Sequence, residues 1–301
     1  MDNIFAVDIG GSKMVCAVLT TTGDILDSCR FDYKPGYTVE MLFDMVKTGY
    51  ERLKEYPCEC CGAAIPGLCD IEKGYWLYSP FSGIENLPVA DRIREITGLQ
   101  TFADNDVNVS ALAERYFGLC KEIDDFVWLT VSNGIGGGLF LNGEVYIGKR
   151  MTSGEIGHII VEEENGRTCG CGNVGCLEAM ASGASIGAIY NERTGSNITA
   201  KEIALLARNG DKEAVKVWSE AGTYIGKASA HVINTLGIET VVLGGGAAEA
   251  FDLIEPSANK ALDRFMFRRA NPNAKIYHSK LGSFAALKGC AALVLDCIKE
   301  E

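Results

Sequence analysis

Short apolar runs alternate with glycine-rich turns at the start of the chain and again in its second half. Residues 4–7 and 14–19 are apolar runs of strand length on either side of a glycine turn. The same order returns at residues 126–131 and 139–141, with the glycine-rich segment 133–138 between them. Such runs predict buried strands, and glycine permits the tight return that joins them. Two units far apart in the sequence predict an internally duplicated protein with one glycine hairpin in each half.

Helical patterns fill much of the rest of the chain. Helices are expected at residues 41–56, 107–120, 200–209, 212–236 and 287–299, and further strands at residues 61–65, 100–102 and 240–243. Residues 265–269 mix apolar and basic side chains, and we expect a half-buried helix with a solvated basic end there. Strands that alternate with helices favour an α/β fold.

The length of 301 residues favours two domains, at about 150 residues per domain. Residues 118–124, just before the second glycine hairpin, are the expected boundary. An N-terminal α/β lobe would then comprise residues 1–120, completed by the C-terminal helix at 287–301. A C-terminal α/β lobe would comprise residues 121–286.

Charge and composition exclude several classes of function. Lys and Arg number 28 against 40 Asp and Glu, which gives a net charge of −12. Such an acidic chain is a poor partner for nucleic acid or for an anionic membrane, because both are bound by clustered basic residues. The sequence has no apolar run of about 18 residues and does not start like a signal peptide, so we expect a cytoplasmic protein.

Twelve cysteines are unusual for such a protein, and their spacing suggests a metal site. Cys169, Cys171 and Cys176 lie in one glycine-rich loop, with His158 upstream. Three thiolates and one imidazole form a closed ligand set for structural zinc, although incidental buried cysteines are the alternative. The other nine are expected to be reduced thiols. Cys58, Cys60, Cys61 and Cys69 are interpreted as core thiols and not as a second cluster. Cys60 and Cys61 are adjacent in the sequence, and adjacent residues of a strand point to opposite faces.

The glycine turns suggest a phosphate site. Backbone N–H groups can face a phosphate where side chains are absent, as at Gly10-Gly11-Ser12-Lys13 and Asn133-Gly134-Ile135-Gly136. Each turn alone could be merely conformational, and neither has the spacing of a dinucleotide fingerprint or a P-loop. A nucleotide site is nevertheless favoured, because the turn occurs twice and a third glycine run follows at Gly244-Gly245-Gly246. Asp8 could in addition hold a metal-bound water.

A polar cluster, Asp104-Asn105-Asp106-Val107-Asn108, precedes an expected helix. It is not a calcium loop, because Val109 and Arg115 occupy the positions that require glycine and glutamate. Helix capping and a polyol-binding or proton-accepting site are both open readings. Glu155 and Glu178 lie close in sequence to the proposed zinc ligands, and each alone would be a solvated surface acid.

Taken together, these motifs resemble the ROK family (repressors, open reading frames and sugar kinases). They are the glycine turns beginning at Asp8 and Asn133, the Asp104 cluster, Gly154-Glu155-Ile156-Gly157-His158, the loop from Cys169 to Glu178, and residues 243–246. The resemblance implies the duplicated two-lobe actin-like ATPase fold with a structural zinc loop. It also implies ATP and Mg²⁺ as cofactors, with the first two turns on the ATP phosphates and the third near the adenosine.

The resemblance further implies roles for single residues. Asp106 would be the catalytic base, and Asn105, Glu155, His158 and Glu178 would bind sugar hydroxyls, with His158 also on zinc. The expected activity is ATP-dependent phosphorylation of a hexose or N-acetylhexosamine, with a glucose-type sugar as the first candidate substrate. Alternatives are N-acetylmannosamine, fructose or a β-glucoside as substrate, or a non-catalytic sugar sensor.

The resemblance also bears on assembly and on substrate. It implies a homodimer. A DNA-binding repressor is not expected, since the acidic chain starts directly at its first strand. The sequence departs from the family pattern at Asn133, at Asp104 and in residues 78–83, and these departures leave the identity of the sugar open.

Overall fold

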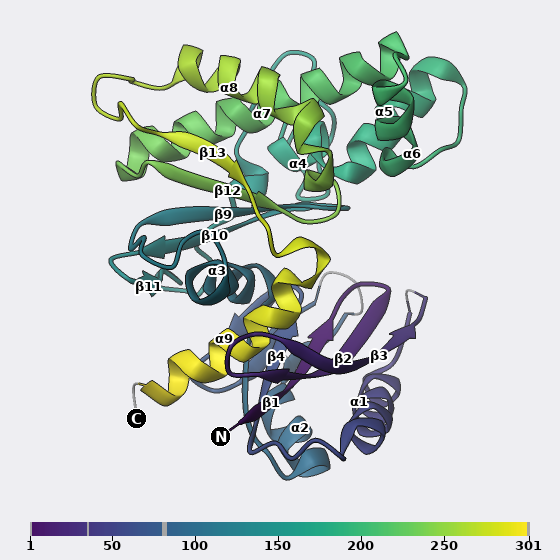
Figure 1. Ribbon diagram of the computed structural model, residues 1–301. Coiled ribbons are helices and arrows are strands. Elements are labelled where there is room, and N and C mark those ends of the chain that lie inside the picture. The colour runs from purple at the N-terminus through teal and green to yellow at the C-terminus, as the bar shows by residue number, and fades with distance from the viewer. Residues whose placement is uncertain (1, 35, 80–82, 300–301) are drawn as a thin grey trace. The chain divides into compact units, whose positions relative to one another are not determined.

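The computed structural model describes residues 2–34, 36–79 and 83–299, and the chain divides into two compact units (Figure 1). Unit 1 comprises residues 1–122, 147–152 and 284–301, and unit 2 comprises residues 123–146 and 153–283. Over the described residues, no helix is both long enough and apolar enough to span a bilayer.

Unit 1 is built on a five-stranded sheet with the strand order β3-β2-β1-β4-β8. The first three strands are antiparallel, whereas β1, β4 and β8 run parallel. The strands are β1 (Asn3–Ile9), β2 (Lys13–Thr20), β3 (Ile25–Asp32), β4 (Cys60–Ile65) and β8 (Gln100–Asn105). A small second sheet contains β5 (Leu68–Asp70), β6 (Tyr75–Tyr78) and β7 (Glu85–Leu87).

Four helices complete unit 1: α1 (Val39–Leu53), α2 (Val89–Thr97), α3 (Asp106–Phe117) and α9 (Ala285–Lys299). Helix α9 packs on α3 and on β4. Its close approach depends on two glycines, because a Cβ at Gly62 would collide with the Cys290 carbonyl and one at Gly289 with the Val109 carbonyl. The last described helix of the chain therefore belongs to the core of unit 1.

Unit 2 repeats this plan with a second five-stranded sheet, in the order β11-β10-β9-β12-β13. Its strands are β9 (Phe126–Val131), β10 (Ile135–Leu141), β11 (Glu144–Val145), β12 (Thr240–Gly244) and β13 (Lys275–His278). Its α-helices are α4 (Leu177–Ala181), α5 (Gly183–Thr194), α6 (Ala200–Arg208), α7 (Lys212–Leu236) and α8 (Phe251–Phe265). Short 3₁₀ helices are η1 (Ile156–His158), η2 (Ala248–Ala250) and η3 (Gly282–Phe284).

The two sheets have equivalent strand orders: an antiparallel meander followed by two parallel strands. The prediction of an internally duplicated α/β fold, with a glycine hairpin at the start of each half, is confirmed.

The second glycine hairpin is tighter than its sequence suggested. We expected the whole of residues 133–138 to form the turn, but β10 already begins at Ile135, and Gly136 and Gly137 pair with Thr130 and Leu129. A Cβ at Gly137 would collide with Ile156 and with the Gly154 carbonyl. Gly137 therefore serves close packing within a strand, and only residues 132–134 lie between the two strands.

The expected helix at residues 265–269 is wrong. Helix α8 ends at Phe265, and Met266 is already extended. Asn234 of α7 causes this end, since its Nδ2 donates to the Phe265 carbonyl and its Oδ1 accepts from the Phe267 N–H. These bonds pair with the Asn234 side chain a carbonyl and an N–H group that another helical turn would have paired within the helix.

Helices α7 and α8 lie side by side in unit 2, and their contact predicts a stability effect (Figure 1). A Cβ at Gly226 of α7 would collide with the Ala258 carbonyl of α8. We expect Gly226→Ala to lower the free energy of unfolding by about 1–3 kcal/mol, the usual cost of overpacking.

Gly187 of α5 is the matched control, because its added Cβ would meet its nearest neighbour only at 3.7 Å. Gly187→Ala should be neutral or stabilising by up to about 1 kcal/mol, because alanine favours helix. Urea unfolding of both variants measures the difference. Equal effects of the two substitutions would contradict the packing argument.

Candidate active site and metal centre

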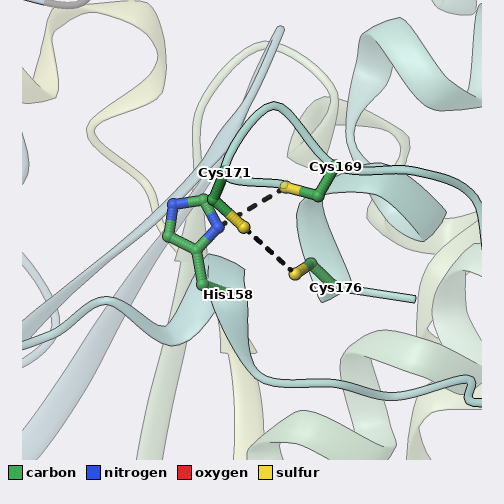
Figure 2. Close-up of side chains that lie close together, drawn as sticks. All are labelled: His158, Cys169, Cys171 and Cys176. Atoms are coloured by element: carbon green, nitrogen blue, oxygen red, sulfur yellow. Dashed lines mark hydrogen bonds between the residues drawn. The ribbon is translucent and has the colours of Figure 1, made fainter. Parts of the chain in front are cut away.

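Four metal-ligating side chains of unit 2 converge in one place (Figure 2). The ligand atoms of His158, Cys169, Cys171 and Cys176 all lie within 4.8 Å of one another. The Sγ atoms of Cys171 and Cys176 are 3.6 Å apart, and Cys169 Sγ is 3.6 Å from His158 Nδ1. A tetrahedral zinc ion with bonds of about 2.3 Å to sulfur and 2.0 Å to nitrogen would separate such pairs by about 3.8 and 3.6 Å. The four residues therefore fit a closed tetrahedral zinc site.

Glycines let the loop bring its three sulfurs together. Gly172 and Gly175 have φ values of 92° and 79°, a region that side chains disfavour. At Gly175 a Cβ would also collide with the Glu162 carbonyl. Backbone hydrogen bonds also hold the loop, among them those of the bridges that pair Ile160 with Cys176 and Thr168 with Val174.

The second ring nitrogen of His158 points away from the three cysteines (Figure 2). Nε2 lies 3.7 Å from Glu155 Oε2, so a carboxylate lies on the far side of the ring from the proposed ion. Such a carboxylate fixes the orientation of a ligating imidazole.

The segment that carries Glu155 and His158 packs directly on strand β10. A Cβ at Gly154 would collide with the Gly137 carbonyl, and one at Gly157 with the Ile135 carbonyl. Two glycines of the motif are therefore needed for backbone-to-backbone contact. Because of this contact, the histidine ligand lies beside the second glycine hairpin.

Glu178 joins the same hairpin to the metal loop. It lies in the first turn of α4, two residues beyond Cys176, and its Oε2 accepts a hydrogen bond of 3.0 Å from the Ile135 N–H. A Cβ at Gly134 would collide with this oxygen. Sequence reasoning selected Glu178 but did not predict this backbone bond.

The second and third glycine runs lie side by side in unit 2, because Gly244 pairs with Thr130 at the end of parallel strands. The start of α5 contacts the same turn, with the Gly183 and Ala184 N–H groups donating to the carbonyls of Ser132 and Asn133. Within the described ranges, the N–H groups of Asn133 and Gly134 have no protein acceptor. This pair of amides can receive an anion.

The first glycine turn, in unit 1, has the same arrangement. Gly10 N–H donates to the Lys13 carbonyl, whereas the N–H groups of Gly11 and Ser12 have no acceptor among the residues that the structure describes. Tyr33 holds this turn from the end of β3, with its hydroxyl 2.6 Å from the Gly10 carbonyl and 3.0 Å from the Lys13 carbonyl. Sequence analysis missed Tyr33, since a single tyrosine after a strand carries no signal of its own.

Three carboxyl groups gather at the carboxyl ends of the parallel strands in unit 1. Asp8 of β1 and Asp104 of β8 both pair with Ala64 of β4, which places them in one row across the sheet. Asp106 follows as the first residue of α3. Burial raises the pKa of Asp8 to about 6, against the opposing charge of Lys13, and it also raises the pKa of Asp104 to about 6.

Asp106 has the highest pKa of the three, at about 7. Burial is the main cause, and the neighbouring Asp8 charge is the second. The helix N-terminus would favour the ionised form, but its effect is smaller here than that of burial. A carboxyl group with a pKa near neutrality can accept and release a proton under physiological conditions.

Asn105 is the N-cap of α3, which was one of its two open readings. Its Oδ1 accepts from the N–H groups of Val107 and Asn108, at 2.9 and 3.3 Å. Its Nδ2 donates one hydrogen to the Gly67 carbonyl, at 2.7 Å. The amide nitrogen has a second hydrogen to donate to a ligand.

The structure thus gathers the predicted residues in two groups. Asp8, the first glycine turn and the Asp104–Asp106 cluster lie in unit 1. The other two glycine runs, Glu155, Glu178 and the four candidate metal ligands lie in unit 2. Of the segment 78–83, residues 80–82 lie outside the described part of the chain.

The raised pKa of Asp104 predicts how stability depends on pH. Because the folded state binds this proton more tightly than the unfolded chain does, the contribution to stability is complete below about pH 4 and is lost as the pH rises through 6. Asp104 is only 2% exposed, so the shift corresponds to about 3 kcal/mol at most.

We therefore expect Asp104→Asn to lose less stability than the unchanged protein between pH 4.5 and 7.5. Urea unfolding of both zinc-loaded proteins at the two pH values measures the difference, in which the pH effects of distant groups cancel. The Asp104 charge also raises the pKa of Asp106, so the effect of its removal on Asp106 has the same sign. An identical pH slope in the two proteins would contradict the prediction.

Comparison with known proteins identifies relatives along nearly the whole chain. The ROK family model matches residues 4–297. A glucokinase of Halalkalibacterium halodurans is 29% identical, over 96% of this chain and 93% of the relative. An N-acetylmannosamine kinase of Salmonella paratyphi A is 32% identical, over 82% of this chain and 84% of the relative. The N-acetylglucosamine repressor of Escherichia coli O157:H7 is also 32% identical, over 76% of this chain and 58% of its own length.

A solved structure extends the likeness to three dimensions. The ROK glucokinase of Streptomyces griseus, in complex with glucose and AMPPNP, superposes with a TM-score of 0.86 at 28% identity. The alignment covers 97% of this chain and 98% of the glucokinase. The duplicated α/β plan, the His–Cys₃ cluster and a family match from residue 4 to residue 297 agree with one another: the chain is a member of the ROK family.

Proposed function

We propose that the protein is an ATP-dependent sugar kinase that phosphorylates a hexose or N-acetylhexosamine, glucose-type first, with Asp106 as general base. One observation supports the proposal: Asp106, with a pKa of about 7, lies near Asp8, the last residue but one of the strand that precedes the first glycine turn. A kinase needs a proton acceptor for the sugar hydroxyl close to the groups that hold phosphate.

The chain's own groups suit the parts of phosphoryl transfer. Asp106 accepts the proton of the attacking hydroxyl. The N–H groups of Gly11 and Ser12, with Lys13 beside them, and those of Asn133 and Gly134 bind phosphate oxygens. Gly244, Gly245 and Gly246 are assigned to the adenosine: Gly244 ends β12 beside the Trp128 ring, and a side chain at Gly246 would meet nothing nearer than 4.0 Å.

Mg²⁺ fits the same region of unit 1. Asp8 has the hard oxygen ligands that Mg²⁺ prefers, and it is not fully buried. When bound, the ion would neutralise negative charge on the phosphates. Asp8 is therefore the residue assigned to hold it, through coordinated water.

Sugar hydroxyls are assigned to Asn105, Glu155, His158 and Glu178. Glu178 has its Oε1 for a hydroxyl while Oε2 binds Ile135, and Asn105 has one amide hydrogen to donate. His158 offers Nε2 if Nδ1 binds the metal. Each buried hydroxyl that stays unpaired costs about 1–3 kcal/mol, so convergent polar groups select polyols.

Zinc is the metal proposed for the His–Cys₃ cluster. The ion would hold the loop between His158 and Glu178, so that both side chains are positioned for the sugar. It fills a closed ligand set and takes no part in the chemistry.

The test is an assay of ADP release over a panel of glucose, mannose, fructose, N-acetylmannosamine, N-acetylglucosamine and β-glucosides. We expect turnover, fastest with glucose. Fastest turnover with another sugar would correct the substrate and keep the kinase. Absence of turnover on every sugar would overturn the proposal.

A non-catalytic sugar sensor is the second candidate, because the N-acetylglucosamine repressor is among the relatives. Calorimetry that finds sugar binding without ATP turnover would favour it. Sedimentation of the same sample tests the homodimer that the resemblance implies.

A further inference from the structure

Two cysteines of unit 1 face each other across neighbouring strands, apart from the proposed metal site. Cys16 of β2 and Cys29 of β3 are directly opposed in the antiparallel register. Both side chains point toward helix α1, where a Cβ at Gly49 would meet both sulfurs. No disulfide joins Cys16 and Cys29 in the structure.

The two thiols have different surroundings. Cys16 is fully buried, whereas Cys29 is partly exposed on β3, an edge strand of the sheet. A hydrogen bond from Cys16 lowers the pKa of Cys29 to about 7, against the effect of burial and with help from the Arg52 charge. The same bond, together with burial, raises the pKa of Cys16. Cys29 is therefore the thiolate of the pair, and Cys16 holds the proton.

We propose that Cys16 and Cys29 form a peroxide-sensitive dithiol, a modification site that converts reversibly into an intrachain disulfide. The attacking atom is the Cys29 sulfur and the resolving atom is the Cys16 sulfur. This site lies on the β2–β3 hairpin and is independent of the proposed kinase activity.

The reaction balances with hydrogen peroxide as the oxidant. The Cys29 thiolate attacks one peroxide oxygen, the O–O bond breaks, and Cys29 becomes a sulfenic acid as hydroxide leaves. The Cys16 sulfur then attacks the Cys29 sulfur, the S–O bond breaks, and the hydroxyl leaves with the Cys16 proton as water. Two thiols lose two electrons in total, and one peroxide becomes two waters.

Strand geometry permits the bond with little movement of the backbone. Directly opposed residues of antiparallel strands have Cα atoms about 4.5–5.5 Å apart. Disulfides span about 4.4–6.8 Å between Cα atoms. Because both sulfurs already lie on the α1 side of the sheet, only side-chain rotation is needed.

Cys58 provides a matched comparison within the same unit. It is also partly exposed, but burial raises its pKa to about 11. Cys58 should therefore react far more slowly than Cys29, because the thiolate is the form that attacks peroxide.

The experiment treats the zinc-loaded full-length protein with hydrogen peroxide and maps peptides by mass spectrometry. We expect a Cys16–Cys29 cross-linked peptide pair that dithiothreitol removes, with Cys58 unmodified. In Cys16→Ser, the sulfenic acid at Cys29 should persist and be trapped by dimedone at least about tenfold more than at Cys58.

Two results would overturn the proposal. One is a wild-type map in which Cys29 stays a free thiol after peroxide treatment has oxidised Cys58. The other is Cys29 modified without any link to Cys16. The wild-type map needs no variant to fold, and peptide mapping separates this pair from the thiols of the metal loop.

Discussion

Cys176→Ser is expected to abolish metal binding and to unfold much of unit 2. Cys176 is fully buried, is the N-cap of helix α4, and its Sγ lies 3.6 Å from that of Cys171, so serine leaves an incomplete ligand set in the buried part of the loop. Structural zinc contributes on the order of 10 kcal/mol, which is comparable to the whole stability of a domain. Even partial loss should lower Tm by on the order of 10 °C or more.

The measurements are zinc content by elemental analysis and Tm by calorimetry on the same samples. Zinc should fall from about one ion per chain to nearly none, and a chelator should act on the unchanged protein in the same direction. Cys120→Ser is the control, because Cys120 is equally buried and lies outside the cluster. It should keep its zinc. A stable Cys176→Ser protein, or an unchanged protein that folds without metal, would rule out the structural role.

Asp106→Asn is expected to lower kcat by about 10²–10⁴-fold, the usual contribution of a general base. The fold should be retained, because the amide has nearly the same shape and removes a charge that is costly to bury. The variant should be at least as stable as the unchanged protein at pH 8, where Asp106 is ionised. Binding of sugar, measured by calorimetry, should persist.

The pH profile distinguishes a base from a residue that only shapes the site. Because a base acts in its deprotonated form, kcat/KM of the unchanged protein should rise as the pH increases through about 7. The residual activity of Asp106→Asn should lack this rise. Asp44→Asn, an exposed change on α1, is the control and should leave the profile unchanged. Full activity in Asp106→Asn would remove the residue from the mechanism.

Local patterns predicted the elements that are defined by local physics. The prediction for α7 matches its observed bounds, because Asp211 caps its first turn and Gly237 ends it in the left-handed conformation. The strands β1, β2, β9 and β10 were likewise recognisable as short apolar runs beside glycine turns, whereas β3 and β11 are not apolar runs. The small sheet β5–β7 gave no such signal, since its strands have only three or four residues.

The candidate site was predictable in its residue types and unpredictable in its contacts. Spacing alone selected His158 and the three cysteines that the structure brings together. The bond from Ile135 to Glu178 joins residues 43 positions apart, and Tyr33 reaches Gly10 across 23 positions. A single sequence contains no period or spacing that reports such pairs. The glycines of β10 were wrongly predicted to lie in the turn for the same reason. The segment that packs against them, around Gly154, is distant in the sequence.

Glu178 limits how a new sugar preference could be engineered or evolve in the proposed site. One of its oxygens accepts a hydrogen bond from the backbone of the second glycine hairpin, so a substitution meant to change the sugar would also disturb the turn proposed to bind phosphate. Glu155 differs: its side chain is 59% exposed, and in the part of the chain that the structure describes its carboxylate pairs with the His158 ring alone. Under selection for a different substrate, substitutions should therefore be tolerated at Glu155 and be lost at Glu178.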